Sequence, residues 1–176
     1  VFFGRLEALK GTDDLVSLAS RLDEQQVPFT LDIFGAGSLR EAIEAEIRSA
    51  SLGDIVKIHD PLDFETQLVP YMRRNADIFV CCHRQSDPSC SYMEALGCGT
   101  PIVGYRNRAF AGILAEVDVG WGVPMNALDK LTGMIVQIDR NRHEYSWKIR
   151  SGVQLSRQHS FENTFAKRIN HLKTIV

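Results

Sequence analysis

The sequence predicts an α/β fold, namely a Rossmann-like doubly wound parallel sheet of about six strands with helices on both faces. Apolar runs alternate along the whole chain with amphipathic stretches, which is typical of repeated strand–helix units. One of these runs, Ile78–Cys82, is continuously apolar, as expected for a central strand that is covered on both faces. The 176 residues, 44% of them hydrophobic, are enough to bury the core of a single domain.

The first strand–helix unit is the clearest. Val1–Phe3 is apolar and strand-like, and Gly4–Gly11 follows it as a loop. Apolar residues then recur at helical spacing, so a helix is expected to begin near Thr12 or Asp13. Its buried face consists of Leu15, Leu18, Ala19 and Leu22. Because the chain opens directly in a strand, we expect residues 1–176 to be a single domain whose N-terminal partner domain is absent from this chain.

The next two units follow the same alternation. Strand Phe29–Phe34 ends in the glycine turn Gly35–Gly37, after which Ser38 and Glu41 have the spacing of a capping box that begins a helix. A short third strand, Ile55–Ile58, precedes a helix capped by Asp63. The apolar face of that helix consists of Phe64, Leu68, Val69 and Met72. Pro70 is expected to bend the helix.

The second half of the chain continues the pattern. After Ile78–Cys82 and a polar loop, a helix is predicted over Ser91–Leu96, with a stop at Gly97–Gly99. The remaining elements are a strand at Pro101–Tyr105, a short helix around Ile113–Leu114, a strand near Trp121–Val123, helices over Leu128–Ile138 and from about Asn141, and a terminal helix over Phe161–Ile175. The apolar face of the terminal helix is expected to pack on something, and the sequence does not identify its partner.

Composition argues against several classes of function. The formal net charge of −2, from 20 basic and 22 acidic residues, gives no broad positive field for nucleic acid or anionic lipid. No apolar run approaches the ~20 residues that span a bilayer, and no signal peptide is apparent, so a cytoplasmic location is expected. The four cysteines lack zinc-site spacing, so no metal is expected; they are Cys81, Cys82, Cys90 and Cys98.

Three loops follow strands and should meet at the carboxyl edge of the sheet, where open parallel sheets bind ligands. In the first loop, Arg5 and Lys10 could clamp a diphosphate, with Gly4 allowing a tight turn; the alternative is a pair of solvated cations. In the second loop, Gly35 and Gly37 either serve the strand-to-helix turn or line a ligand pocket.

The third loop carries the strongest pattern. It places a helix N-terminus directly after the central strand, and free N–H groups around Ser89, Cys90 and Ser91 would suit a phosphate. Glu94, one turn inside the helix, could accept hydrogen bonds from a ribose diol. Ser91 and Glu94 also have capping-box spacing, so Glu94 could instead serve only the backbone.

Other polar residues near these loops have less specific interpretations. His83 and Arg84 end the central strand, and we expect His83 to line the pocket mouth or to be structural, because no acid–base partner is apparent. Arg106 and Arg108 either face an anionic substrate or are solvated cations.

The segment Met93–Val103 resembles the signature Glu-Ala-x-x-x-Gly-x-Pro-Val/Ile-Val of family-four glycosyltransferases, which are retaining enzymes of the GT-B fold. The order of the other motifs is also similar. Gly4-Arg5 with Lys10-Gly11 resembles the phosphate-contacting loop of the family, residues 35–40 its glycine turn, and residues 120–124 the segment before its closing helices. The resemblance covers nearly the entire chain, which corresponds to the C-terminal half of a GT-B fold.

The resemblance implies roles for individual positions. Arg5 and Lys10 would bind the donor diphosphate as catalytic cations, Glu94 would bind the ribose hydroxyls, and the backbone around Ser89–Ser91 would hold the phosphates or the sugar. The glycines of the first two loops, Gly4, Gly35 and Gly37, would help to line the donor site.

One departure from the family falls on a functional position. The family usually has a sugar-contacting glutamate eight residues before the one that matches Glu94, and this chain has Ser86 there. Asp87 could replace that glutamate with a one-residue shift and a shorter arm. The identities of the donor sugar, the base and the acceptor therefore stay open.

The resemblance implies a retaining hexosyltransferase-type glycosyltransferase (EC 2.4 class) of carbohydrate biosynthesis, which uses a nucleoside diphosphate sugar as donor and needs no cofactor or metal. The acceptor site would belong to the absent N-terminal domain, so this chain alone is expected to bind nucleotide weakly and to catalyse nothing. Peripheral membrane association through that domain stays open. Two alternatives are a sugar-nucleotide epimerase of the same architecture, which would need further acid–base residues, and a non-catalytic nucleotide-binding or scaffold domain, which Ser86 favours.

Overall fold

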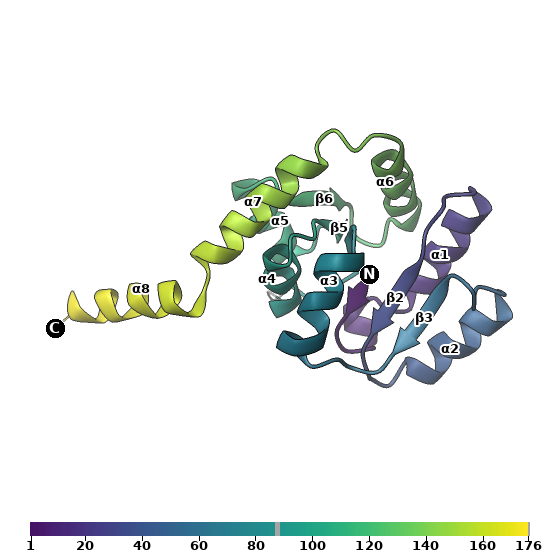
Figure 1. Ribbon diagram of the computed structural model, residues 1–176, viewed down its shortest axis with the longest axis horizontal. Helices are drawn as coiled ribbons and strands as arrows, with labels where there is room; N and C mark the ends of the chain where they lie inside the picture. Colours follow the sequence, from purple (N-terminus) through teal and green to yellow (C-terminus); the bar gives the residue numbers. More distant parts are fainter. Residues whose placement is uncertain (87–88, 176) are drawn as a thin grey trace.

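The computed structural model describes residues 1–86 and 89–175. Its parallel strands in this part of the chain form two hydrogen-bonded groups in the orders β1-β2-β3 and β4-β5-β6 (Figure 1). The strands are β1 (Phe2–Phe3), β2 (Leu31–Phe34), β3 (Val56–His59), β4 (Phe79–Cys81), β5 (Ile102–Tyr105) and β6 (Gly120–Val123). The predicted strands are therefore confirmed, although most are one or two residues shorter than expected or shifted by one.

The two groups join at β1 and β4. The amine of Val1 donates to the Ile78 carbonyl at 2.9 Å, and the Val80 N–H donates to the Val1 carbonyl at 2.9 Å. These two bonds are the pair that parallel strands make, so the strand order across the molecule is 3-2-1-4-5-6. That is the order of a doubly wound Rossmann-like sheet, as the sequence predicts.

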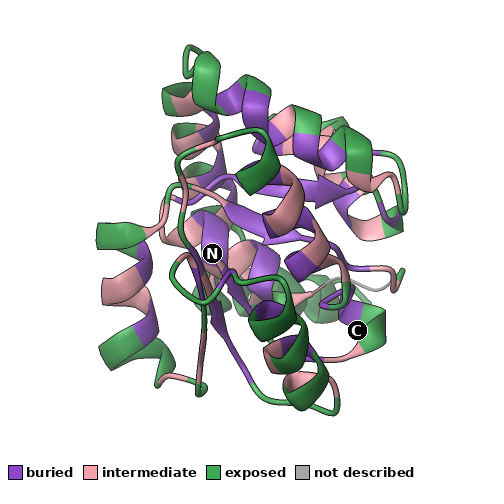
Figure 2. Ribbon diagram, turned by 90° about the vertical axis from the view of Figure 1, so that its right-hand side faces the viewer, coloured by how far each residue is buried: buried purple, intermediate pink, exposed green. Residues whose placement is uncertain are grey.

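Helices connect the strands and cover both faces of the sheet (Figures 1 and 2). α1 packs against α2 and α6, whereas α4 packs against α7. The helical elements are η1 (Ala8–Lys10), α1 (Asp14–Glu24), α2 (Arg40–Ser49), η2 (Phe64–Leu68), α3 (Val69–Asn75), α4 (Cys90–Gly97), α5 (Arg108–Glu116), α6 (Leu128–Arg140), α7 (Tyr145–Gln158) and α8 (Phe161–Lys173).

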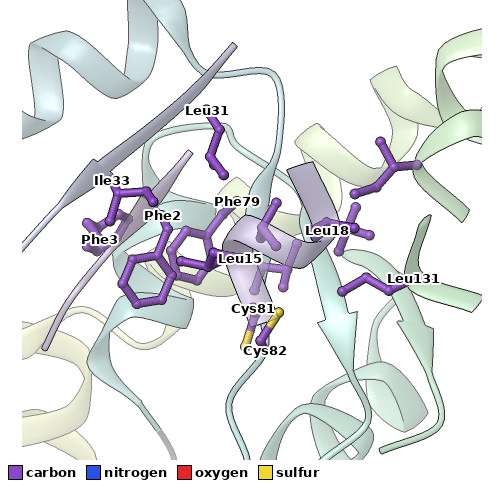
Figure 3. Close-up of a cluster of buried hydrophobic side chains, with 14 of the residues drawn as sticks. Phe2, Phe3, Leu15, Leu18, Leu31, Ile33, Phe79, Cys81, Cys82 and Leu131 are labelled. Atoms are coloured by element: carbon purple, nitrogen blue, oxygen red, sulfur yellow. The ribbon is translucent and has the colours of Figure 1, made fainter. Parts of the chain in front are cut away.

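The core lies between the sheet and these helices. Phe2 and Phe79, from the two strands that join the groups, stack with ring centroids 6.2 Å apart, and both are fully buried. Figure 3 shows Leu15 and Leu18 of α1 pointing into the same cluster. The predicted inner face of α1 is confirmed, because all four of its members have exposed fractions of 5% or less.

Two local predictions about helix starts have different outcomes. Asp63 caps η2 as expected, since its carboxylate accepts the Thr66 N–H at 2.8 Å. The capping box of Ser38 and Glu41 is wrong, because α2 begins at Arg40 with Leu39 at its N-cap. The Leu39 N–H donates instead to the Leu6 carbonyl at 3.0 Å, so a contact with the loop after β1 determines where α2 begins.

The C-terminal helices differ in how they are held. α7 is fixed to the body by the buried Lys148, whose Nζ pairs with Asp118 and Glu144 and lies 4.9 Å from the ring centre of Trp121. α8 extends away from the body (Figure 1). It buries no residue, and its apolar side chains stay exposed: Phe161, Phe165, Ile169 and Leu172. No described helix is both long and apolar enough to cross a membrane.

Candidate functional site

The strand order places a candidate site at the carboxyl edge of the sheet, between β1 and β4. The order of the strands reverses there, with β2 and β3 on the far side of β1 and β5 and β6 on the far side of β4. Doubly wound folds bind ligands beyond the carboxyl ends of the strands at such a point. Two of the loops predicted to carry the site, Gly4–Gly11 and the segment before α4, follow these two strands.

The loop after β1 is held against the glycine turn after β2. The Gly4 N–H donates to the Phe34 carbonyl at 3.0 Å, and the Leu6 N–H donates to the Ala36 carbonyl at 2.9 Å. A Cβ atom at Gly35 would lie 2.0 Å from the Gly4 carbonyl oxygen, and one at Gly37 would lie 2.4 Å from the Leu6 carbonyl oxygen. These two glycines therefore permit the close approach of two loops.

The other end of the same loop is held against β4. Gly11 has a φ of +63°, and a Cβ atom there would lie 1.9 Å from the Cys82 carbonyl oxygen. The Arg84 N–H donates to the Leu9 carbonyl at 3.0 Å, so the turn of η1 is bonded to the segment after β4. The backbone around Lys10 is consequently fixed on both sides.

Lys10 points from this loop to the start of α4. Its side chain is buried, with 8% of the residue exposed, and its Nζ donates to the Ser89 Oγ at 3.1 Å. The Ser89 Oγ lies 2.8 Å from the Ser91 Oγ, so a cation and two hydroxyls form one polar chain at the edge of the sheet. The sequence placed these residues in two separate loops, and the structure brings them together.

The N-terminus of α4 has the properties of an anion site. α4 begins at Cys90, one residue earlier than predicted, with Ser89 at its N-cap and no acidic residue in its first turn. Cys90 is exposed at this end. The positive end of the helix dipole and the amino group of Lys10 therefore face the same place, and both favour a phosphate.

Glu94 lies beyond the first turn of α4, so the capping-box interpretation is wrong. With Ser89 at the N-cap, the Tyr92 N–H bonds the Ser89 carbonyl at 3.1 Å and Glu94 is too far along to reach the cap. Glu94 is half-buried, and burial raises the pKa of its carboxyl. A partly desolvated carboxylate of this kind gains from hydrogen-bond donors such as a pair of hydroxyls.

Arg5 and Ser86 are exposed, whereas Lys10 is buried. The Arg5 side chain is 68% exposed and lies 3.4 Å from a Glu7 carboxylate oxygen. Ser86 is exposed. Asp87, the residue predicted to replace the glutamate of the family, lies outside the described residues.

The polar residues at the end of β4 are packed against or bonded to neighbouring elements. His83 is buried, and its ring stacks on that of Tyr92 with centroids 5.4 Å apart. Arg84 pairs with Asp13 and Asp14 at the start of α1, at 2.7 Å and 2.8 Å. Arg106 and Arg108, beyond β5, are exposed.

Asn107 supports the site and was not singled out from the sequence. It is 3% exposed, and its Nδ2 donates to the Tyr92 hydroxyl at 2.7 Å and to the His83 carbonyl at 3.2 Å. Its Oδ1 accepts the Phe110 N–H and so caps α5. An asparagine just before a predicted helix is the signal that could have identified it.

The cysteines form no metal site in the described part of the chain. Residues 1–86 and 89–175 contain no group of three His, Cys, Asp or Glu side chains arranged to hold an ion. Cys81 and Cys82 are buried as predicted. Burial raises the pKa of the Cys81 thiol to about 11 and that of Cys82 well above its usual range.

Comparison with known proteins gives one family and a consistent fold. The family model described as glycosyl transferases group 1 matches residues 1–151. A curated relative, D-inositol 3-phosphate glycosyltransferase from Arthrobacter sp. (strain FB24), is 30% identical over 110 residues, which is 60% of this chain. The match covers 26% of that relative, so the matched segment spans about a quarter of its length.

Two solved structures share the fold. The pneumococcal O-GlcNAc transferase GtfA, in complex with UDP and GlcNAc, has a TM-score of 0.82 at 16% identity; the match covers 99% of this chain and 35% of that one. The C-terminal domain of the group 1 family protein LpcC from Francisella tularensis has a TM-score of 0.73 at 16% identity, with 88% of this chain and 81% of that one covered. At these identities the likeness concerns the fold alone.

Proposed function

Because this chain belongs to the glycosyl transferases group 1 family, we propose that it is the donor-binding domain of a glycosyltransferase. In this proposal a nucleoside diphosphate sugar binds at the carboxyl edge between β1 and β4, and its sugar is transferred to an acceptor with retention of configuration. Lys10 and the N-terminus of α4 hold the diphosphate, Arg5 closes over it from the exposed end of the loop, and Glu94 accepts hydrogen bonds from the ribose hydroxyls.

The observation that supports the proposal is the convergence of the Lys10 amino group and the N-terminus of α4. The Lys10 Nζ donates to the Ser89 Oγ at the N-cap, and the first turn of α4 has no acidic residue. A diphosphate at this place would accept a charge-assisted hydrogen bond from Lys10 and hydrogen bonds from the first backbone N–H groups of α4.

The same groups account for catalysis in the whole enzyme. As the sugar leaves, negative charge grows on the departing diphosphate, and fixed cations and N–H dipoles stabilise that charge without reorganising. Lys10 is fixed by its loop, so its contribution is available before the reaction begins. This chemistry requires no metal ion at the diphosphate.

We further propose that the acceptor is bound by a second domain that this chain does not contain. The likeness to proteins of more than twice its length supports this division. The exposed apolar face of α8, which carries Phe161, Phe165, Ile169 and Leu172, is a surface that such a domain could cover. On this view the chain alone binds nucleotide and transfers no sugar.

Uridine is the base we propose, because the pneumococcal enzyme with this fold was solved with UDP. Isothermal titration of the chain with UDP, GDP, ADP and uridine tests the proposal. We expect UDP to bind with the highest affinity, and Lys10→Ala to reduce UDP binding while leaving uridine binding unchanged. If no nucleoside diphosphate binds at millimolar concentration, the donor-domain proposal is wrong and a scaffold function is favoured.

The epimerase alternative is tested with the whole protein. An epimerase interconverts two nucleotide sugars without an acceptor and needs acid–base residues at the sugar. Incubation of the full-length protein with UDP sugars should give no epimer, and it should give UDP release once an acceptor is present. Formation of an epimer would overturn the transferase assignment.

A further inference from the structure

Arg84 bonds three separate segments at the carboxyl edge of the sheet. Its backbone N–H donates to the Leu9 carbonyl at 3.0 Å, and its Nη1 donates to the Ala8 carbonyl at 3.1 Å. The same guanidinium pairs with Asp13 at 2.7 Å and with Asp14 at 2.8 Å. Its Nε donates to the Asn126 Oδ1 at 3.2 Å, in the turn between β6 and α6.

Two of these partners directly precede Lys10 in η1. Ala8 and Leu9 present their carbonyls to Arg84, and Lys10 is the last residue of the same short helix. A one-turn helix has little stability of its own, so outside contacts must hold it. The direction of the Lys10 side chain therefore depends on the position of Arg84.

One of the acidic partners, Asp14, is in turn held by a strand of the sheet. The Tyr105 hydroxyl, at the end of β5, donates to the Asp14 Oδ2 at 2.7 Å. Asp13 and Asp14 raise the pKa of Arg84, although its partial burial acts in the opposite direction. The guanidinium is thus a rigid, permanently charged link between β4, η1 and α1.

We propose that Arg84 is a positioning residue for the diphosphate site, which acts through Lys10 without touching the donor. This inference rests on the proposed function. Arg84 holds the η1 turn so that the Lys10 amino group stays beside Ser89 and the N-terminus of α4. The planar fork of arginine is required, because a lysine at this position could not reach Ala8, Asp13, Asp14 and Asn126 together.

The test is a double-mutant cycle read out by nucleotide binding. Arg84→Lys keeps the charge and loses the fork, so we expect UDP affinity to fall about five-fold, as for coupled neighbouring residues, with uridine affinity unchanged. In the Lys10→Ala background the same Arg84→Lys change should cost less than about two-fold in UDP affinity, because the residue on which it acts is gone.

A second readout follows the loop itself. The Lys10 N–H donates to the Glu7 carbonyl at 2.9 Å, and its hydrogen exchange should become faster in Arg84→Lys. Lys148→Met is the matched control, since it removes a buried ion pair near the start of β6, at the opposite edge. It should lower stability without changing the ratio of UDP to uridine affinity.

The outcomes separate this inference from the proposed function. A wild-type chain that binds no UDP overturns the proposed function, and this inference with it. Wild-type binding combined with unchanged UDP affinity in Arg84→Lys overturns the role of Arg84 alone. An equal loss with and without Lys10, or an equal loss of UDP and uridine affinity, shows that Arg84 only stabilises the fold.

Discussion

Two regions at the same edge of the sheet differ in the charged groups that surround the N-terminus of their helix. The β1/β4 region, made of the loop Gly4–Gly11 and the start of α4, has a buried amino group beside a helix N-terminus with no acid in its first turn. The β2/β3 region, made of the turn Gly35–Arg40 and the end of β3, has a guanidinium that bonds Glu44, Asp60 and the Gly35 carbonyl.

The difference shows that a glycine turn after a strand does not by itself make a phosphate site. In the β2/β3 region Gly35 and Gly37 allow the backbone of the neighbouring loop to pack closely. Glu41 lies in the first turn of α2. A phosphate there would meet a carboxylate and backbone N–H groups that already have partners. In the β1/β4 region the first turn of α4 has no acidic residue and Lys10 lies beside it, so our proposal places the diphosphate there.

The largest expected effect is on stability and comes from Gly35→Ala. The added Cβ would lie 2.0 Å from the Gly4 carbonyl oxygen, and backbone on both sides cannot move easily. We expect the free energy of unfolding to fall by about 3 kcal/mol, measured by urea denaturation. Gly53→Ala is the control, because nothing lies within 4 Å of its Cβ position. Equal stabilities of the two variants would show that the two loops do not pack as described.

The next effect is on binding and distinguishes the two regions directly. Lys10→Ala should weaken UDP binding by about 2 kcal/mol, or roughly thirty-fold, because a hydrogen-bonded cation is removed from the diphosphate. Arg40→Ala, in the β2/β3 region, should leave the ratio of UDP to uridine affinity unchanged. Titration calorimetry of both variants measures these ratios. If Arg40→Ala changes the ratio of UDP to uridine affinity more than Lys10→Ala does, the diphosphate binds in the β2/β3 region instead.

A smaller effect concerns the pH dependence of stability and comes from Asp32 in β2. Burial acts to raise the pKa of Asp32, but hydrogen bonds from Tyr71 and His59, both at 2.6 Å, outweigh it and lower the pKa. A lowered folded-state pKa means that the carboxylate stabilises the fold above its ordinary pKa, near 3.8, and that this stability is lost as the pH falls through the lower folded value.

Asp32→Asn tests this pH dependence. It should lower stability at pH 7 by about 1 kcal/mol, and the difference between variant and wild type should shrink as the pH falls below about 4. UDP affinity at pH 7 should not change, because Asp32 lies away from the β1/β4 region. A constant stability difference from pH 7 to pH 3 would show that the carboxylate charge is not the stabilising feature.

The smallest effect belongs to Arg5. Its side chain is 68% exposed, and exposed ion pairs contribute about 0.2–1 kcal/mol. Arg5→Ala should therefore reduce the UDP affinity of this chain only about two-fold, and raised salt should remove most of the difference. A loss as large as that of Lys10→Ala would mean that Arg5 is drawn into the site when the nucleotide binds.

The sequence predicts the order of strands and helices because each apolar pattern is local. Ile78–Cys82 was recognised as a central strand from its composition alone, and the structure confirms it. The capping box of Ser38 and Glu41 failed because a contact with Leu6, more than thirty residues earlier, determines where α2 begins. Helix starts that depend on distant contacts are not encoded in the local spacing.

In the candidate site, too, the sequence predicts local features and does not predict contacts between distant segments. The sequence named Arg5 and Lys10 together, as two cations of one loop, and could not tell them apart. Lys10 is buried because Gly11 packs on Cys82 and because Ser89, 79 positions away, accepts its hydrogen bond. These are contacts between distant segments, which only the fold brings together.

The most direct test of the central claim is the ¹H–¹⁵N NMR spectrum of the chain during titration with UDP. The amides of Lys10, Cys90 and Ser91 should shift with UDP and not with uridine, because the diphosphate binds at the N-terminus of α4. The amides of Arg40 and Glu41 at the start of α2 should respond equally to both ligands. Shifts specific to the diphosphate at α2, with none at α4, would contradict the account.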